Sequence, residues 1–227
     1  VISQNDDMKE SNVSAQGEEL NNILNYVINF CNEKNYKAKK LWLEKILPEI
    51  YVDNLVKKYN YVEDKFILKP IIGEFDYPNN QRQELLTINL TSDGNTSIYG
   101  SSGSGKELLI SSLIYSLITN HSPSEVNIYI LDCGSGIFGN FRKAPHIGDI
   151  VTIIEEEKIS NLFKMIEGEI DKRKKLFVDY NGDFQNYIKR SGKTIPYILL
   201  IINYYDVFQE TFDYDEVINR ISRECAK

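Results

Sequence analysis

The stretch that most constrains this chain runs from Thr96 to Thr119, with the sequence TSIYGSSGSGKELLISSLIYSLIT. A short β-prone run leads into a turn of glycine and serine, and a helix with apolar periodicity follows at once. This order is typical of a phosphate-binding loop, in which backbone N–H groups and a helix N-terminus surround a phosphate and a lysine reaches its outer oxygens. We therefore expect eight residues to contact a nucleotide: Gly100, Ser101, Ser102, Gly103, Ser104, Gly105, Lys106 and Glu107.

One position of this loop departs from the motif. Gly100, Gly105 and Lys106 fit the spacing G-x-x-x-x-G-K, but Glu107 stands where the motif has the Ser or Thr that binds magnesium. Two interpretations are open. Either the site has decayed and Glu107 is an ordinary acidic residue at a helix N-terminus, or its carboxylate ligates Mg²⁺ directly.

A nucleoside-triphosphatase also needs a hydrophobic strand that ends in an acidic residue near the magnesium ion. Two runs compete for this role. The run Glu125–Asp132 ends in an acid but follows directly on the helix of the loop, whereas Pro196–Tyr204 is more apolar and more distal. We expect Pro196–Tyr204 to be a central buried strand, and it ends in Asn203 and Tyr204.

These two residues predict poor hydrolysis. The amide of Asn203 brings no charge, and Tyr204 is a weak base at neutral pH because the pKa of tyrosine is about 10. Asp206 lies two residues further on and is a possible substitute. If Glu107 does ligate magnesium, neutral Asn203 would be the second residue facing the metal, in a charge swap between the two positions.

The remaining pattern predicts an α/β protein, with a parallel sheet and helices on both of its faces. We expect a polar tail over residues 1–16, a mostly helical lead-in over 17–65, and the nucleotide-binding domain over 66–227. The alternating run Leu85–Leu90 and the run Thr96–Tyr99 flank the turn Asp93-Gly94, which predicts a hairpin or a bent pair of strands.

Composition excludes several classes of protein. With 26 basic and 33 acidic residues the net charge is −7, which argues against a surface built to bind nucleic acid. The cysteines Cys31, Cys133 and Cys225 are widely spaced without a C-x-x-C motif, so neither a zinc site nor a disulfide framework is indicated. No run approaches the ~20 apolar residues of a membrane span.

Several further motifs occur in order along the chain. They are Lys40-Leu41-Trp42-Leu43 with Leu47-Pro48, Gly73-Glu74-Phe75-Asp76-Tyr77-Pro78 with Gln81 and Gln83, Leu131-Asp132-Cys133-Gly134, Ala144-Pro145-His146-Ile147-Gly148, Arg173-Lys174-Lys175-Leu176-Phe177, and Ile195-Pro196 through Tyr205-Asp206-Val207-Phe208. Together with the loop, this set resembles the FtsK/SpoIIIE-type ATPase modules of type VII secretion motors, the EssC/EccC family. The loop alone is generic, whereas the ordered set is specific.

The resemblance implies a RecA-like P-loop fold that binds ATP and Mg²⁺, with Glu107 at the magnesium Ser/Thr position and Asn203 at the magnesium-aspartate position. It also implies a large protein anchored on the cytoplasmic side of the bacterial membrane, with several modules in tandem, small secreted substrates of the WXG100 type and a possible hexamer. Both departures are similar to degenerate downstream modules, so a regulatory or substrate-docking C-terminal module is expected. The family domain continues beyond the last element here, so we expect an incomplete sheet.

Three readings therefore stay open from the sequence. The first is a nucleotide-binding module of a secretion motor with weak or absent hydrolysis. The second is an interaction domain whose loop no longer binds nucleotide. The third is an active DNA translocase of the FtsK kind, which the net charge of −7 and the altered metal position disfavour.

Overall fold

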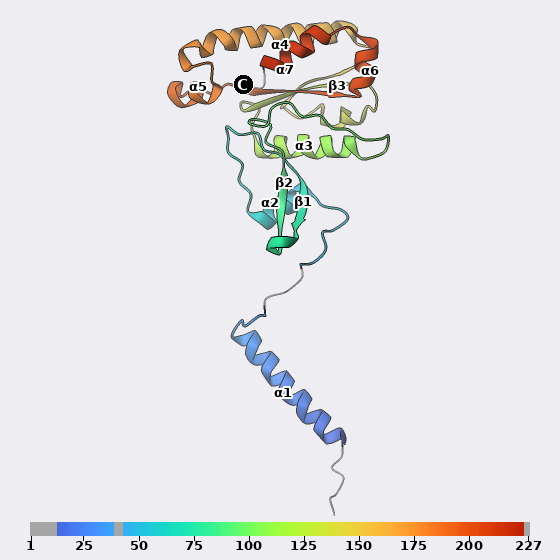
Figure 1. Cartoon of the computed structure of the whole chain (residues 1–227), viewed down its shortest axis with the longest axis vertical. Coiled ribbons are helices and arrows are strands. Elements are labelled where there is room, and N and C mark those ends of the chain that lie inside the picture. The colour runs from blue at the N-terminus through green and yellow to red at the C-terminus, as the bar shows by residue number, and fades with distance from the viewer. Residues whose placement is uncertain (1–12, 39–42, 225–227) are drawn as a thin grey trace, which may run out of the picture. The chain divides into compact units, whose positions relative to one another are not determined.

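The computed structural model describes residues 13–38 and 43–224 (Figure 1). The chain divides into two compact units, Val1–Glu44 and Lys45–Lys227. The first twelve residues of the expected tail and the motif residues Lys40–Trp42 lie outside the described part of the chain.

The described residues of the first unit contain one helix, α1 (Val13–Glu33), which begins within the predicted tail and continues into the predicted helical lead-in. Its apolar side chains are exposed, among them Leu20, Ile23, Leu24, Val27 and Ile28. Among the described residues, no helix combines the length and the apolar character that crossing a bilayer requires.

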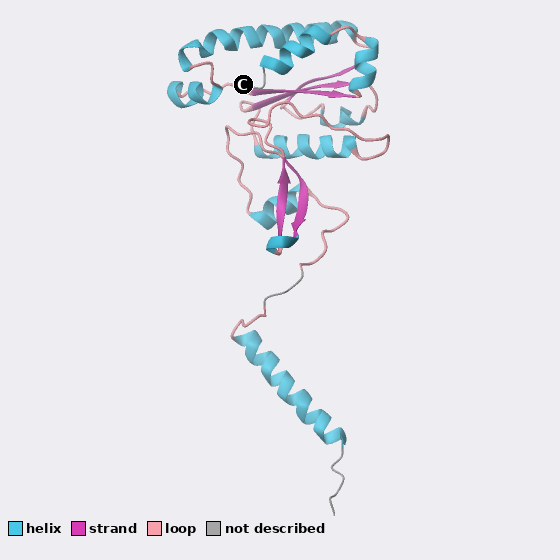
Figure 2. Ribbon diagram, viewed as in Figure 1, coloured by secondary structure: helices cyan, strands magenta, loops and turns pink. Residues whose placement is uncertain are grey.

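The second unit is built on a three-stranded parallel sheet, shown as magenta arrows in Figure 2. β3 (Val126–Asp132) lies in the middle, with β4 (Ile147–Thr152) on one side and β5 (Tyr197–Asn203) on the other. The prediction that the most apolar run would be central is wrong, because among the described strands β5 pairs only with β3. The expectation that this run is buried also fails for most of its length, because six of the seven β5 residues are only partly buried. Apolar character therefore does not report the place of a strand in the hydrogen-bonded order.

Helices cover both faces of this sheet, as predicted (Figure 1). On one face, α3 (Lys106–Asn120) packs Ile110, Ile114 and Leu117 against the β3 residues Ile128 and Ile130. On the other face lie α4 (Glu156–Phe177), α6 (Tyr205–Thr211) and α7 (Asp215–Glu224). Because successive side chains of β3 point to opposite faces of the sheet, β3 contributes residues to two separate apolar cores.

Two short elements complete the region between α4 and β5. A 3₁₀ turn, Val178–Tyr180, is followed by α5 (Phe184–Ser191). The carboxylate of Asp183 accepts a hydrogen bond of 2.8 Å from the backbone N–H of Asn186 and so caps the N-terminus of α5.

A two-stranded antiparallel hairpin precedes the loop, and it differs from the predicted one. β1 (Ile71–Tyr77) pairs with β2 (Arg82–Thr87) across the 3₁₀ turn Pro78–Asn80. α2 (Val52–Tyr59) comes before this hairpin, and the backbone N–H of Ile71 donates a 2.9 Å hydrogen bond to Ser116 Oγ on α3. The hairpin is thereby fixed to the helix that follows the loop.

The predicted pairing of Leu85–Leu90 with Thr96–Tyr99 is therefore wrong. Residues 96–99 adopt no strand, although Ile98 packs on the α3 core, and Tyr99 is 91% exposed. A run of four residues needs a neighbouring strand for its backbone hydrogen bonds, and none of the described strands pairs with it. The chain reaches the loop in an irregular conformation.

Candidate functional site

Two glycines of the predicted phosphate-binding loop adopt a left-handed backbone conformation. Gly103 and Gly105 adopt φ values of +74° and +89°, in the left-handed region that glycine adopts without strain. No atom would lie within 4 Å of a Cβ at either position, so the backbone on these sides of the loop is open. Residues 101–105 are all exposed, and α3 begins at Lys106. The loop thus presents its amides and a helix N-terminus at the surface.

The side chain of Lys106 folds back over the loop. Its Nζ donates hydrogen bonds to the carbonyl oxygens of Gly100, at 2.5 Å, and of Ser101, at 2.9 Å. These are contacts to exposed backbone oxygens, which water also satisfies. A phosphate oxygen carries more charge than a carbonyl oxygen and is therefore the stronger acceptor for this ammonium group.

Glu107 lies in the first turn of α3 and contacts the residue after β5. The hydroxyl of Tyr204 donates a 3.0 Å hydrogen bond to Glu107 Oε1. The pKa of Glu107 is lowered, first by a hydrogen bond from its own backbone N–H and second by the Tyr204 hydroxyl. The same contact raises the pKa of Tyr204, so its hydroxyl stays protonated at neutral pH and cannot serve as a base.

Tyr204 is held in a constrained conformation. Its φ of 57° and ψ of 58° lie in the left-handed region, which side-chain-bearing residues rarely adopt. Its ring lies so close to Gly134 that a Cβ on that glycine would come within 2.6 Å of the Tyr204 ring. Glycine at position 134 thus leaves the space into which Tyr204 fits, and the ring bridges the ends of β3 and β5 to the start of α3.

Asn203 faces a different partner, at a group we name the strand-end junction, which consists of Asp132, Ser135 and Asn203. Asp132 and Asn203 are the last residues of β3 and β5 and lie opposite each other in the parallel register. Asn203 Nδ2 donates to Asp132 Oδ1 at 3.0 Å and to Ser135 Oγ at 3.2 Å. Asp132 and Asn203 are buried, with 4% and 3% of their surfaces exposed. The amide nitrogen of Asn203 is thereby committed to the neighbouring strand.

The two oxygens of Asp132 differ. Oδ1 also accepts hydrogen bonds from the backbone N–H groups of Gly134, at 3.2 Å, and Ser135, at 3.1 Å. Oδ2 is buried and has no hydrogen-bond partner among the described residues. Since a buried carboxylate oxygen without a donor is costly, this atom is suited to a ligand that supplies positive charge or a donated hydrogen bond.

Oxygen atoms of Glu107, Asp132 and Asn203 are the kinds of ligand that Mg²⁺ prefers. Within the described residues, no group of three or more His, Cys, Asp or Glu side chains is arranged to hold a metal ion. The residues present fit an ion that keeps most of its ligands from water and nucleotide phosphates, which is the usual coordination of Mg²⁺ beside a phosphate-binding loop. When bound, such an ion would neutralise phosphate charge.

The sequence-predicted residues fall into two groups. Gly100–Lys106 form the loop, and Glu107 and Tyr204 meet beside it, whereas Asn203 points its amide nitrogen away toward Asp132. Asp206 lies exposed in the first turn of α6. Sequence reasoning missed Ser135 and treated Asp132 only as a rival strand end. The signal was that Asp132 and Asn203 both end parallel strands, whose carboxyl ends meet at one edge of a sheet.

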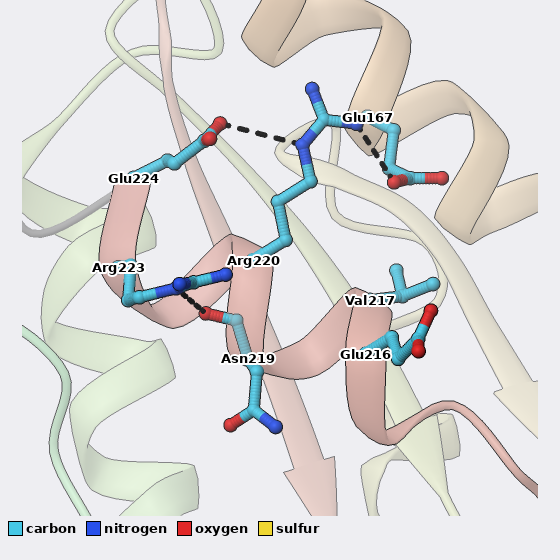
Figure 3. A pocket seen from close by; sticks show the side chains of 7 residues that line it. All are labelled: Glu167, Glu216, Val217, Asn219, Arg220, Arg223 and Glu224. Atoms are coloured by element: carbon cyan, nitrogen blue, oxygen red, sulfur yellow. Dashed lines mark hydrogen bonds and ion pairs between the residues drawn. The ribbon is translucent and has the colours of Figure 1, made fainter.

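Two other polar regions lie apart from the loop. One is a pocket of about 710 Å³ between α4 and α7. Figure 3 shows its lining side chains, among them Glu167, Arg220 and Glu224. Arg220 pairs with Glu167, at 2.9 Å, and with Glu224, at 3.5 Å, so these charges satisfy one another. His146 is buried, with Nε2 2.9 Å from the carbonyl oxygen of His121, which agrees with a structural role.

This fold and loop together have a clear relationship to known proteins. The FtsK/SpoIIIE family model matches residues 61–208, which is more than half of the chain. The chain therefore belongs to the FtsK/SpoIIIE family.

Relatives within the family are type VII secretion proteins. EssC of Staphylococcus aureus (strain Mu50 / ATCC 700699) is 27% identical over 186 residues, a match that covers 78% of this chain and 13% of EssC. ATPases 2 and 3 of EssC from Geobacillus thermodenitrificans superimpose with a TM-score of 0.67 at 24% identity, covering 80% of this chain and 34% of that one. EccC of Thermomonospora curvata (ATPases 2 and 3), solved with a signal sequence peptide, gives a TM-score of 0.61 at 21% identity, covering 68% and 29%.

These matches confirm the expected family and the α/β fold of its ATPase domains. The chain corresponds to a small part of each relative, about one eighth of EssC by the matched length. What the whole secretion proteins do, bind and assemble with is therefore a matter of proposal for this chain.

Proposed function

We propose that this chain is a nucleotide-binding module of a type VII secretion motor that holds ATP and hydrolyses it weakly or not at all. The observation that supports this most directly is the contrast between the two parts of the candidate site, the loop and the end of β5. The loop with Lys106 is open at the surface, whereas the residue at the end of β5 is a buried, internally hydrogen-bonded Asn203. A site of this composition can bind phosphates without positioning an attacking water.

Binding would use the backbone of the loop and Lys106. A phosphate at the N-terminus of α3 meets unpaired backbone N–H groups and the positive end of the helix dipole. Lys106 Nζ would exchange its two carbonyl partners for phosphate oxygens, and this exchange gains a charge-assisted hydrogen bond. The loop does not need to unfold for this step, because Gly103 and Gly105 already have the required left-handed conformation.

Turnover would be slow for three structural reasons. No carboxylate ends β5, so an attacking water has no base at that position. Tyr204 is protonated and its hydroxyl is engaged by Glu107. Asp206 is exposed in the first turn of α6, where its charge is screened by solvent. Electrostatic placement is the main catalytic contribution to phosphoryl transfer, and this site lacks it.

Within the motor, a module that holds nucleotide without turnover would act in regulation or in substrate docking. Its partners would be neighbouring ATPase modules of the same polypeptide and small helical substrates of the WXG100 type, in a full-length protein that we propose to be membrane-anchored and hexameric. The EccC structure that contains a signal sequence peptide supports substrate docking by domains of this family.

A second candidate is an interaction domain whose loop no longer binds nucleotide. The hydrogen bonds of Lys106 to its own loop and of Tyr204 to Glu107 favour it, because both satisfy binding groups internally. These contacts are exposed or half-buried, so water exchanges for them readily and a phosphate can compete.

Isothermal titration with ATP and Mg²⁺ separates the two candidates. We expect saturable binding by the wild-type chain and a loss of about 100-fold in affinity for Lys106→Ala, because a charge-assisted contact worth about 3 kcal/mol is removed. The matched control is Lys175→Ala, which removes an exposed lysine from α4 on the opposite face of the sheet. No binding by wild type, or equal affinity of wild type and Lys106→Ala, would favour the second candidate.

A further inference from the structure

The strand-end junction contains a buried carboxylate, Asp132, one of whose two oxygens has no partner among the described residues. Asp132 is buried at the end of the central strand, and three donors converge on its Oδ1: two backbone N–H groups and the amide of Asn203. Its Oδ2 receives none within the described part of the chain. Capping of the turn after β3 accounts for the two backbone N–H donors, whereas the hydrogen bond from Asn203 links this carboxylate to the last residue of β5.

We propose that Asp132 supplies the negative charge on the magnesium side of this site and acts through the amide of Asn203. The acidic position of the motif has, on this proposal, moved from the end of β5 to the end of β3. The assignment rests on the proposed function, because it requires a nucleotide in the loop. Asp132 is a positioning residue in this scheme and Asn203 is the residue nearer to the ligand.

The hydrogen bonds of Asn203 define how this would work. Both hydrogen bonds of its amide nitrogen run to the β3 side, one to Asp132 and one to Ser135. The carbonyl oxygen is the one polar atom of the amide that is left for another partner. A hydrogen bond from the amide N–H to a carboxylate polarises the amide and makes that carbonyl oxygen a better acceptor. Asn203 would thus accept a hydrogen bond from a metal-bound water as an aspartate does.

The charges around the junction agree with this arrangement. The hydrogen bond to Glu107 is the main cause of the raised pKa of the Tyr204 hydroxyl, and the charge of Asp132 adds a smaller contribution, so both carboxylates act on the region around Tyr204. Two carboxylates beside the loop repel a bare nucleotide, and Mg²⁺ bound to the phosphates lowers this repulsion because the carboxylates attract the metal ion. The site would therefore select the magnesium complex over free ATP.

A charge swap across the two strands tests the assignment. Asp132→Asn keeps an acceptor for the amide of Asn203 and removes the charge. The double variant Asp132→Asn with Asn203→Asp returns the charge to β5 and keeps an amide–carboxylate hydrogen bond between the strands. The readout is the ratio of the ATP dissociation constants measured in EDTA and in Mg²⁺ by isothermal titration. Comparing this ratio between variants cancels the effect of the metal on ATP itself.

We expect Asp132→Asn to lower this ratio about tenfold and the double variant to restore it to within about threefold of wild type. An unchanged ratio in Asp132→Asn, or a double variant that stays as low as the single one, would overturn the assignment and leave the proposed function in place. Wild-type protein that binds ATP in neither buffer would overturn the proposed function and, with it, the role of Asp132.

Asp206→Asn is the matched comparison, because it makes the same chemical change three residues from Asn203 at an exposed position. We expect no change in its ratio, and a fall comparable to that of Asp132→Asn would move the acidic role to Asp206 and overturn the assignment. Thermal unfolding of each variant shows that it is folded. If Asp132→Asn alone does not fold, recovery of both the fold and the ratio in the double variant supports the assignment, and recovery of the fold without the ratio contradicts it.

Discussion

The phosphate-binding loop and the strand-end junction each have a glycine at a key position, but for different physical reasons. In the loop, Gly103 is required for its positive φ of +74°, and the space around it is empty. Beside the junction, Gly134 has no positive φ, but a Cβ there would come within 2.6 Å of the Tyr204 ring. One glycine is fixed by backbone conformation and the other by packing.

This difference suggests that the loop mainly determines nucleotide affinity, whereas the junction mainly determines the stability of the fold. The loop is exposed and its groups bond to backbone oxygens or solvent, so substitutions in it should change nucleotide affinity more than stability. Asp132 and Asn203 of the junction are buried at the ends of two paired strands, so substitutions near it should first change stability. The predictions below separate these two kinds of effect.

The largest effect on stability is expected for Gly134→Ala. The added methyl group meets three atoms of the Tyr204 ring at 2.6, 2.7 and 2.9 Å, so the ring or the backbone at position 134 must shift. We expect a loss of about 1–3 kcal/mol in the free energy of unfolding, measured by denaturant titration, as for other overpacked sites. Gly139→Ala is the control, because nothing lies within 4 Å of its Cβ position. Equal stability of the two variants would contradict the packing of Tyr204 on Gly134.

A smaller effect is expected for Gly103→Ala. Alanine has room there but must adopt a positive φ, which costs about 1–2 kcal/mol. Because the loop is exposed, part of this cost can be relieved by local rearrangement, and the variant should lose nucleotide affinity along with this stability. Gly168→Ala is the matched control in the exposed interior of α4, where alanine is favoured by about 1 kcal/mol. The two variants should shift the unfolding midpoint in opposite directions, and shifts of one sign would refute this view of the loop.

The smallest effect is expected for Tyr204→Phe, and it concerns the pH response. The Tyr204 hydroxyl is the second cause of the lowered pKa of Glu107, after the backbone N–H of Glu107 itself. Its removal should raise the pKa of Glu107 part of the way toward the ordinary value, which an NMR titration of the carboxyl carbon measures.

The sign of the linked stability follows from that direction. A carboxylate whose folded-state pKa is lowered stabilises the fold above its unfolded-state pKa, and the contribution is lost as the pH falls through the folded-state value. Tyr204→Phe should therefore lose less stability than wild type on acidification through this range. A Glu107 pKa that does not move would show that the hydroxyl contact is absent in solution.

The parts of the fold that depend on local pattern were predictable from the sequence. The helix α3 follows from the spacing of its apolar side chains, and the parallel sheet with helices on both faces follows from the handedness of crossover connections; the structure contains both. The hairpin partner of β2 and the position of β5 were predicted wrongly. Both depend on which strands pair across long sequence distances, and turn signals and apolar character do not encode that choice.

The candidate site also has a part that local sequence predicts and a part that depends on long-range strand pairing. The conformation of the loop is a property of seven consecutive residues, so glycine spacing alone predicts it. The contact of Asn203 with Asp132 joins residues 71 positions apart, and that of Tyr204 with Glu107 joins residues 97 apart. Nothing in the local sequence at 203 indicates that its amide is held by the neighbouring strand. Only the parallel register of β3 and β5 brings these residues together.

The central claim is that the loop holds ATP while the strand ends fail to turn it over. The most direct measurement is to incubate the protein with saturating ATP and Mg²⁺, isolate the complex rapidly, and identify the bound nucleotide chromatographically. The account predicts about one nucleotide per chain, recovered as ATP over many times the turnover time of a typical ATPase, since typical enzymes turn over at roughly 10 per second. Recovery of ADP, or of no nucleotide at all, would contradict it.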